Sequence, residues 1–277
     1  MARPARLSGA GIAKPGLVPG FSLLGGKLLT GQGDASCAAA CARFGMQKKV
    51  AVVQSNYIPW KGYFDLIRSV DAFVLYDDVQ YTRRDWRNRN KIKTAQGEHW
   101  LTIAVKNRGR YEQLINEVEV SDADWAAQHW KTIEMSYRRA PCFAQMEAPL
   151  RALFEQAAKL QHLSSINHLL IAGLCPLLGI HTPLYRSEDL PGADGRNERL
   201  IQLCLALGAS EYLSGPAASC YMDEAAFAAA GLDVSYMNYA GYPEYPQMYG
   251  EFAHALSVID LLFNTGADAP AFLERRA

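Results

Sequence analysis

The segment from residue 80 to residue 91 carries the densest group of side chains that could bind an anion. Trp86 and the amides of Gln80 and Asn88 stand among its cations, and Asp85 is its only acid. The cations are Arg83, Arg84, Arg87, Arg89 and Lys91. A charge run is usually a solvated surface, but such surfaces rarely contain a tryptophan. Because the planar guanidinium group matches phosphate and carboxylate groups, the segment predicts a site for an anionic substrate.

A polar and aromatic segment, residues 54–67, precedes this basic segment and reads QSNYIPWKGYFDLI. Gly62 lets the backbone approach a ligand or a neighbouring helix closely. The predicted helix start beside it offers free N–H groups that suit a phosphate. An aromatic loop can also simply cover a core, and the loop alone does not decide between the two. The candidate binding residues are Gln54, Asn56, Tyr57, Trp60, Gly62 and Tyr63.

Asp77 and Asp78 are the candidate catalytic residues, with the expected role of orienting an amine or a hydroxyl. Adjacent side chains on a strand point to opposite faces, so we expect only one of the two carboxylates to face the site. Ser214 lies outside a GxSxG elbow and is interpreted as a hydrogen-bond donor rather than a nucleophile. Tyr245 belongs to a loop that could either cover the hydrophobic core or line a ligand-binding site. The six histidines show no metal-ligand spacing, so no metal site is predicted.

Two short apolar runs must position these residues. Residues 49–53 and 72–76 have the composition of buried strands, and residues 61–68 between them have helical spacing. Such a βαβ unit implies a parallel pair with a right-handed crossover. In an open parallel sheet, ligands bind beyond the carboxyl ends of the strands. The loops after both strands are therefore expected to share one pocket.

The rest of the chain predicts an α/β fold built on an open, Rossmann-like parallel sheet with a helical insertion. Further strands are expected at 100–105, 115–120, 182–185, 211–214 and 232–236. Further helices are expected at 125–139, 144–159, 166–178, 196–207 and 252–263. Residues 1–45, basic with Asp34 as the only acid, are expected to form a disordered N-terminal extension, either a targeting leader or the product of a misplaced start codon. Residues 46–266 then form one domain, and residues 267–277 a C-terminal tail.

The overall composition narrows the class of protein. Lysine plus arginine and aspartate plus glutamate both number 28, and this balance argues against a general nucleic-acid binder, single-stranded RNA included. No apolar run reaches 18 residues, so no membrane span is expected. The six cysteines are scattered without a CxxC pair, which is typical of reduced core residues and favours a cytoplasmic location.

Several motifs together resemble the WbqC-like protein family. They are QSNYIPWKGYFDLI (54–67), DDVQYTRRDWRNRNKIK (77–93), YLSG (212–215), YPEYPQ (242–247) and SVIDLLFNTG (257–266). The likeness covers nearly everything between residues 46 and 266. The family takes its name from bacterial O-antigen gene clusters, so the resemblance implies a role in surface-polysaccharide or amino-sugar biosynthesis.

A weaker likeness links the βαβ start to the nucleotidyltransferase superfamily, for example pantothenate synthetase. Residues 60–63 stand where that superfamily has its HxGH loop, and both histidines are missing here. Those histidines stabilise charge on the transferring phosphate, so their absence puts nucleotide chemistry in doubt. The sequence shows no cofactor motif of its own, and the likeness implies ATP or a nucleotide-linked substrate as the ligand.

These observations leave more than one function open. The first is a transferase that forms an acyl or aminoacyl amide on a nucleotide-linked amino sugar, with a nucleotide sugar or an acyl donor as its anionic small-molecule substrate. The second is a non-catalytic binding or scaffold protein of a glycan assembly complex. The third is an ATP-using ligase resembling the nucleotidyltransferases. The sequence offers binding groups for each but no evident nucleophile or general base.

Overall fold

The computed structural model describes residues 47–274, and the extension predicted for residues 1–45 lies outside them. Its centre is a five-stranded parallel sheet with the strand order β5–β2–β1–β6–β7. Val53 at the end of β1 pairs with Leu75 at the end of β2, so the two strands end at one level. The predicted α/β class with an open parallel sheet is confirmed. The strands are β1 (Lys49–Val53), β2 (Ala72–Leu75), β5 (Leu184–Arg186), β6 (Glu211–Ser214) and β7 (Asp233–Tyr236).

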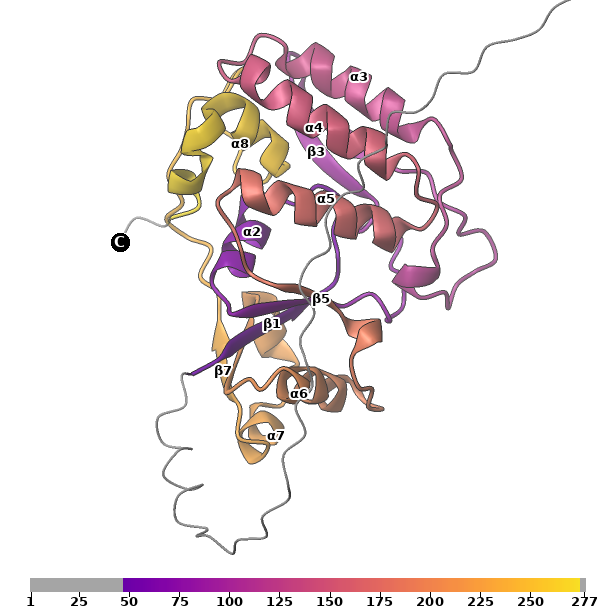
Figure 1. Cartoon of the computed structure of the whole chain (residues 1–277), viewed down its shortest axis with the longest axis vertical. Helices are drawn as coiled ribbons and strands as arrows, with labels where there is room; N and C mark the ends of the chain where they lie inside the picture. Colours follow the sequence, from indigo (N-terminus) through magenta and orange to yellow (C-terminus); the bar gives the residue numbers. More distant parts are fainter. Residues whose placement is uncertain (1–46, 275–277) are drawn as a thin grey trace, which may run out of the picture. The chain divides into compact units, whose positions relative to one another are not determined.

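Alternate residues of the central strands pack against different helical layers. Val50 and Val52 belong to a buried cluster with residues of α6 (Arg196–Ala206) and α7 (Glu224–Ala229). Ala51 and Phe73 belong to a second cluster with α2 (Lys61–Arg68) and α5 (Leu163–Leu177). Because both faces are covered, the central strands read as continuous apolar runs. Figure 1 shows α6 and α7 below the sheet and α2 and α5 above it.

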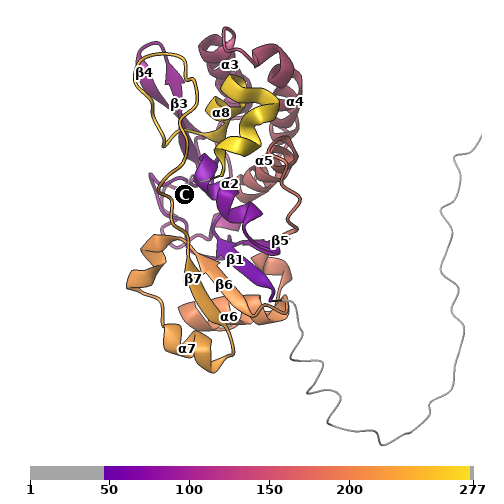
Figure 2. The same ribbon diagram turned by 90° about the vertical axis from the view of Figure 1, so that its left-hand side faces the viewer.

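A helical insertion with a β-hairpin separates β2 from β5. The hairpin pairs β3 (Arg89–Thr94) with β4 (Gly97–Thr102) in antiparallel register. Two antiparallel helices follow, α3 (Trp125–Tyr137) and α4 (Phe143–Ala157), and α8 (Val258–Thr265) from the C-terminal end packs against α4 and β3. Figure 2 shows this group gathered at the end of the molecule away from α7. The 3₁₀ helices are η1 (Ile115–Glu117), η2 (Ser187–Asp189), η3 (Pro216–Cys220) and η4 (Gly266–Phe272).

Four expectations about secondary structure need correction. Residues 115–120 were expected as a strand, but Ile115–Glu117 is a 3₁₀ turn and Val120 makes only an isolated bridge to Val105. The strand expected at 100–105 ends earlier, at Thr102, and pairs in the hairpin rather than the main sheet. The last helix begins at residue 258, not 252. β3 was not expected, because its sequence RNKIKT looks like a solvated charge run.

The C-terminal end of the described chain is packed. Ala269 and Leu273 are fully buried, although residues 267–277 were expected to form a tail beyond the domain. In residues 47–274, no helix is both long enough and apolar enough to cross a membrane.

Candidate functional site

The strand order places a crevice at the carboxyl ends of β1 and β6. From β1 the chain moves outward through β2 to β5, and it then returns across the sheet to β6 on the other side of β1. Such a reversal is the position where open α/β sheets bind ligands, because the loops on its two sides diverge. Gln54 follows β1, Asp78 follows β2 by three residues, and Ser214 is the last residue of β6.

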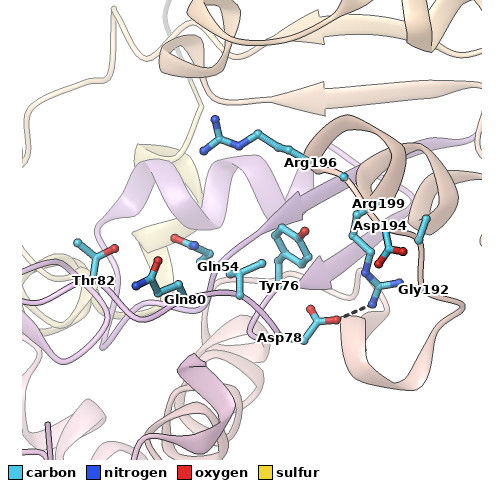
Figure 3. A pocket seen from close by; sticks show the side chains of 12 residues that line it. Gln54, Tyr76, Asp78, Gln80, Thr82, Gly192, Asp194, Arg196 and Arg199 are labelled. Carbon is cyan, nitrogen blue, oxygen red and sulfur yellow. Dashed lines mark hydrogen bonds and ion pairs between the residues drawn. The ribbon is translucent and has the colours of Figure 1, made fainter. Parts of the chain in front are cut away.

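A cavity of about 880 Å³ lies at this edge. Figure 3 shows its side chains arriving from the ends of β1 and β2 and from the start of α6. A smaller cavity of about 300 Å³ adjoins it, because both are lined by Gln54, Tyr76 and Arg196. We call the two together the sheet-edge site. The larger cavity is lined by Gln54, Tyr76, Asp78, Val79, Gln80, Thr82, Gly192, Ala193, Asp194, Gly195, Arg196 and Arg199.

Two arginines of α6 supply positive charge to the sheet-edge site. Arg199 donates to the carboxylate of Asp78 over 2.6 Å and to the carbonyl of Ser187 over 2.8 Å, so a neighbouring acid already balances its charge. Figure 3 shows the ion pair between Asp78 and Arg199 as a dashed line. Arg196 is the exposed first residue of the helix, and its guanidinium lies 4.3 Å from the centre of the Tyr221 ring. Its charge is therefore available to a ligand.

The backbone at the start of α6 adds to that positive charge. Gly195 precedes the helix with φ of 93°, a conformation that side chains disfavour. The turn exposes the first N–H groups of an 11-residue helix at the cavity wall. Free N–H groups and the helix dipole both favour a negatively charged group at this position, and the carboxylate of Glu198 in the first turn lies beside Gly195 there.

Arg87 reaches the smaller cavity from the basic segment. Its side chain is 13% exposed and lies 3.4 Å from the Asp85 carboxylate, and its guanidinium also donates to the Asn56 side chain. Burial lowers the pKa of this arginine and Asp85 opposes the shift, but an arginine stays charged in proteins. Its Nε atom is buried without a hydrogen-bond partner in the described chain. Arg87 therefore lines the smaller cavity with a guanidinium that already contacts Asp85 and Asn56, while its buried Nε–H is shielded from solvent.

Asp77 and Asp78 turn to opposite faces of the sheet. Asp77 is 1% exposed, accepts the backbone N–H of Ser55 over 2.9 Å, and lies 2.8 Å from Nε2 of His168 on α5. Asp78 lines the larger cavity on the α6 side. Of the two candidate catalytic residues, the structure thus places Asp78 in the cavity wall and Asp77 in the interior.

Most of the basic segment lies outside the sheet-edge site. Arg83 donates to the backbone of Asn107 over 2.6 Å and stacks on Tyr111 at 4.9 Å. Arg84 is exposed, and Lys91 pairs with Glu98 at 2.6 Å on the hairpin. None of these three cations is among the residues that line the two cavities. The predicted cation cluster is therefore divided, with Arg87 alone turned to the sheet edge.

A third cavity, of about 280 Å³, opens on the other side of the Asn56 and Arg87 side chains. It is lined by Asn56, Pro59, Trp60, Trp86, Asn90 and Ala255. We call it the aromatic cavity. A Cβ atom at Gly62 would lie 2.3 Å from the Trp60 ring, so this glycine is required by the close approach of the indole. The aromatic cavity thus gathers four of the predicted residues around it: Asn56, Trp60, Gly62 and Trp86.

The remaining predicted residues are placed as follows. Gln80 lines the large cavity, and Ser214 lines the small one. Four others are buried in the fold and line neither the sheet-edge site nor the aromatic cavity, and of these the hydroxyl of Tyr245 donates to Asp260 over 2.7 Å. The four are Tyr57, Tyr63, Asn88 and Tyr245. Their hydrogen bonds tie the site's loops to the core.

Comparison with known proteins agrees with this arrangement of motifs. The model of the WbqC-like protein family matches residues 54–272. The chain belongs to the WbqC-like protein family. It is also similar to an uncharacterized protein of Mycobacterium tuberculosis, Rv1507c, with 49% identity over 228 residues, which cover 82% of this chain and 97% of the relative. The comparison with solved structures found no match.

One wall of the site in this WbqC-like protein was not found from its sequence. Residues 192–196 read GADGR and lead into α6, but only the helix from residue 196 onward was predicted. The signal was a glycine-flanked turn followed by arginines on a helix that crosses back to β6. This turn can be recognised as part of the site only when the strand order is known, because the order places β5 and β6 on opposite sides of β1.

Proposed function

We propose that this WbqC-like protein is a transferase that forms an acyl or aminoacyl amide on a nucleotide-linked amino sugar of a bacterial surface polysaccharide. In this proposal the phosphates of the substrate bind at the sheet-edge site, against Arg196, Arg87 and the start of α6. The family name, which comes from O-antigen gene clusters, supports the biosynthetic setting. The position of the arginines beside free helix N–H groups supports the phosphate ligand.

The single observation that carries the proposal is the placement of unpaired positive charge at the sheet's reversal point. Arg199 is balanced by Asp78 and Arg87 lies 3.4 Å from Asp85, but Arg196 forms no salt bridge within residues 47–274. A charge-assisted hydrogen bond contributes roughly 1.5–3 kcal/mol. In this proposal the Arg196 guanidinium and the start of α6 together bind the phosphates of the substrate.

The roles of other groups follow from the same placement. Asp78, held by Arg199, is positioned to accept a hydrogen bond from an amine or hydroxyl in the larger cavity. Ser214 and Gln54 add neutral hydrogen-bonding groups at the ends of β6 and β1. Arginines beside a phosphate also stabilise charge that develops when a phosphorylated leaving group departs. That role fits an ATP-using ligase, which expels a phosphate group as the amide forms. In the transferase the nucleotide diphosphate stays on the sugar, and the arginines only bind it.

A thermal-shift panel tests the proposal. Nucleotide sugars, ATP, free amino acids and inorganic phosphate are added separately to the whole protein. A ligand at 100 times its Kd stabilises the folded state by roughly 2.7 kcal/mol. We expect a nucleotide sugar to raise the melting temperature of the native protein but not of Arg196→Ala.

Arg110→Ala is the matched control, because Arg110 is an exposed arginine that pairs with Glu119 at 3.5 Å and lines neither cavity of the sheet-edge site. It should respond to the nucleotide sugar as the native protein does. A response to ATP with an amino acid, but not to a nucleotide sugar, would favour the ligase. If no small molecule stabilises the protein, and only a partner protein does, the scaffold interpretation replaces the transferase.

A further inference from the structure

The aromatic cavity is a built site rather than a surface depression. Trp60 packs edge-on against Tyr239 at 5.1 Å and Tyr242 at 6.1 Å, and Gly62 leaves no room for its ring to move inward. Trp86 packs against Trp100 at 5.4 Å, yet these two rings remain 40% and 38% exposed. Large aromatic side chains held in place and still open to solvent are typical of a binding surface.

The backbone around the cavity is held in a costly conformation. Ile58 has φ of 37° and Arg84 has φ of 58°, values that residues other than glycine rarely adopt. The Asn90 side chain donates to the carbonyls of Tyr57 over 3.1 Å and Ile58 over 2.9 Å, and so fixes the first of these loops. Strain that the surroundings maintain concentrates at ligand sites, because it places side chains before the ligand arrives.

The chemistry of the lining selects the kind of ligand. The Asn56 carbonyl oxygen accepts from Arg87, while its amide nitrogen has no partner within the described chain. Arg89 lies 4.3 Å and Lys91 5.2 Å from the Trp100 ring, beside the exposed indoles. An indole face with an amide beside it in the cavity lining suits a pyranose, which lays its C–H face on the ring and turns its hydroxyls to the amide.

A nucleobase fits the same lining less well. Bases gain most when they stack between aromatic faces, but Trp86 already gives one face to Trp100, and Trp60 is fixed by edge contacts. The volume of about 280 Å³ is near the lower end of small-molecule sites, roughly 300–1,000 Å³, which fits one sugar ring.

We propose that the aromatic cavity binds the pyranose ring of the amino sugar. This inference rests on the proposed function: Asn56, which lines the aromatic cavity, accepts a hydrogen bond from Arg87, which lines the smaller cavity of the sheet-edge site. A nucleotide sugar with its phosphates beside Arg87 then extends its sugar toward Trp86.

Saturation-transfer NMR with the methyl glycosides of glucosamine and N-acetylglucosamine tests this inference without any nucleotide. We expect transfer to the sugar ring protons in the native protein and about tenfold weaker binding in Trp86→Ala, which removes an exposed indole face. Gly62→Ala should weaken binding as well, because the new methyl group displaces the Trp60 ring. Tyr111→Ala, which removes an aromatic side chain that is 71% exposed elsewhere, should bind like the native protein.

Absence of transfer in the native protein, or equal transfer in Trp86→Ala, would overturn the inference. Transfer to the base protons of UMP that depends on Trp86 would also overturn it, since a nucleobase would then occupy the cavity. Circular dichroism of each variant checks that it is folded. Glycoside binding and nucleotide stabilisation are measured on different probes, so this inference and the proposed function can fail separately.

Discussion

Lys61 gives the most quantitative prediction. Its ammonium group is buried, and within the described chain no carboxylate forms a salt bridge with it. Its side chain is 3% exposed, donates to the Pro243 carbonyl over 3.0 Å, and faces the Tyr242, Tyr245 and Phe252 rings at 5.1 to 5.6 Å. These contacts hold the loop of residues 242–252 against α2, next to the Trp60 ring. Burial lowers the pKa of Lys61 from 10.5 to about 8, with Glu244 opposing the shift.

The direction of the pH dependence follows from this lowered pKa. Between pH 8 and 10.5 the unfolded chain still carries a proton that the folded protein has released, so stability rises with pH in that window. From pH 7 to 9.5 the predicted gain is about 2 kcal/mol. The variant Lys61→Met cannot show this gain, because it has no amine to titrate.

Urea unfolding of both proteins at pH 7, 8, 9 and 9.5 measures the effect. The native protein should gain about 2 kcal/mol relative to Lys61→Met across that range. Lys159→Met, at an exposed lysine, is the control and should follow the native curve. Parallel pH curves for the native protein and Lys61→Met would refute the argument from burial.

Three further variants test other buried contacts. Asp260→Asn should cost about 2 kcal/mol in urea unfolding, since one of the buried donors on its carboxylate loses its acceptor. Burial lowers the pKa of His129 from 6.5 to about 4. The unfolded chain therefore gains its proton first, and stability should fall by up to roughly 3 kcal/mol as the pH drops from 6.5 to 4; His129→Gln should flatten that fall. Arg199→Met should cost about 2–3 kcal/mol by thermal or urea unfolding, because Asp78 loses its charged partner. An unchanged midpoint for Asp260→Asn or Arg199→Met would contradict the argument for that contact, as would an unchanged fall in stability toward acid pH for His129→Gln.

The parallel sheet could be predicted because its central strands are apolar on both faces. The runs KVAVV and AFVL need no distant information to be recognised as buried strands. β3 could not be predicted this way, because Asn90 and Lys93 are buried only by virtue of distant acceptors. Asn90 binds carbonyls of the loop after β1, and Lys93 binds the side chain of Gln247 over 2.9 Å.

The sequence could predict the candidate site where local backbone geometry determines the direction in which a side chain points. The pleat alone requires Asp77 and Asp78 to face opposite sides, and they do. Local rules could not say which arginines turn inward. Arg83 and Arg87 are four residues apart in the same basic run, yet only Arg87 reaches the sheet edge. That difference is set by Asn56, which follows β1 and accepts from the Arg87 guanidinium.

The most direct test of the central claim is a calorimetric titration of the protein and Arg87→Ala with a nucleotide sugar. If the sheet-edge site holds its phosphates, the native protein binds and the variant binds roughly 10- to 150-fold more weakly, the loss of one charged hydrogen bond. Arg110→Ala should keep the native affinity. Equal affinities for the native protein and Arg87→Ala would contradict the account.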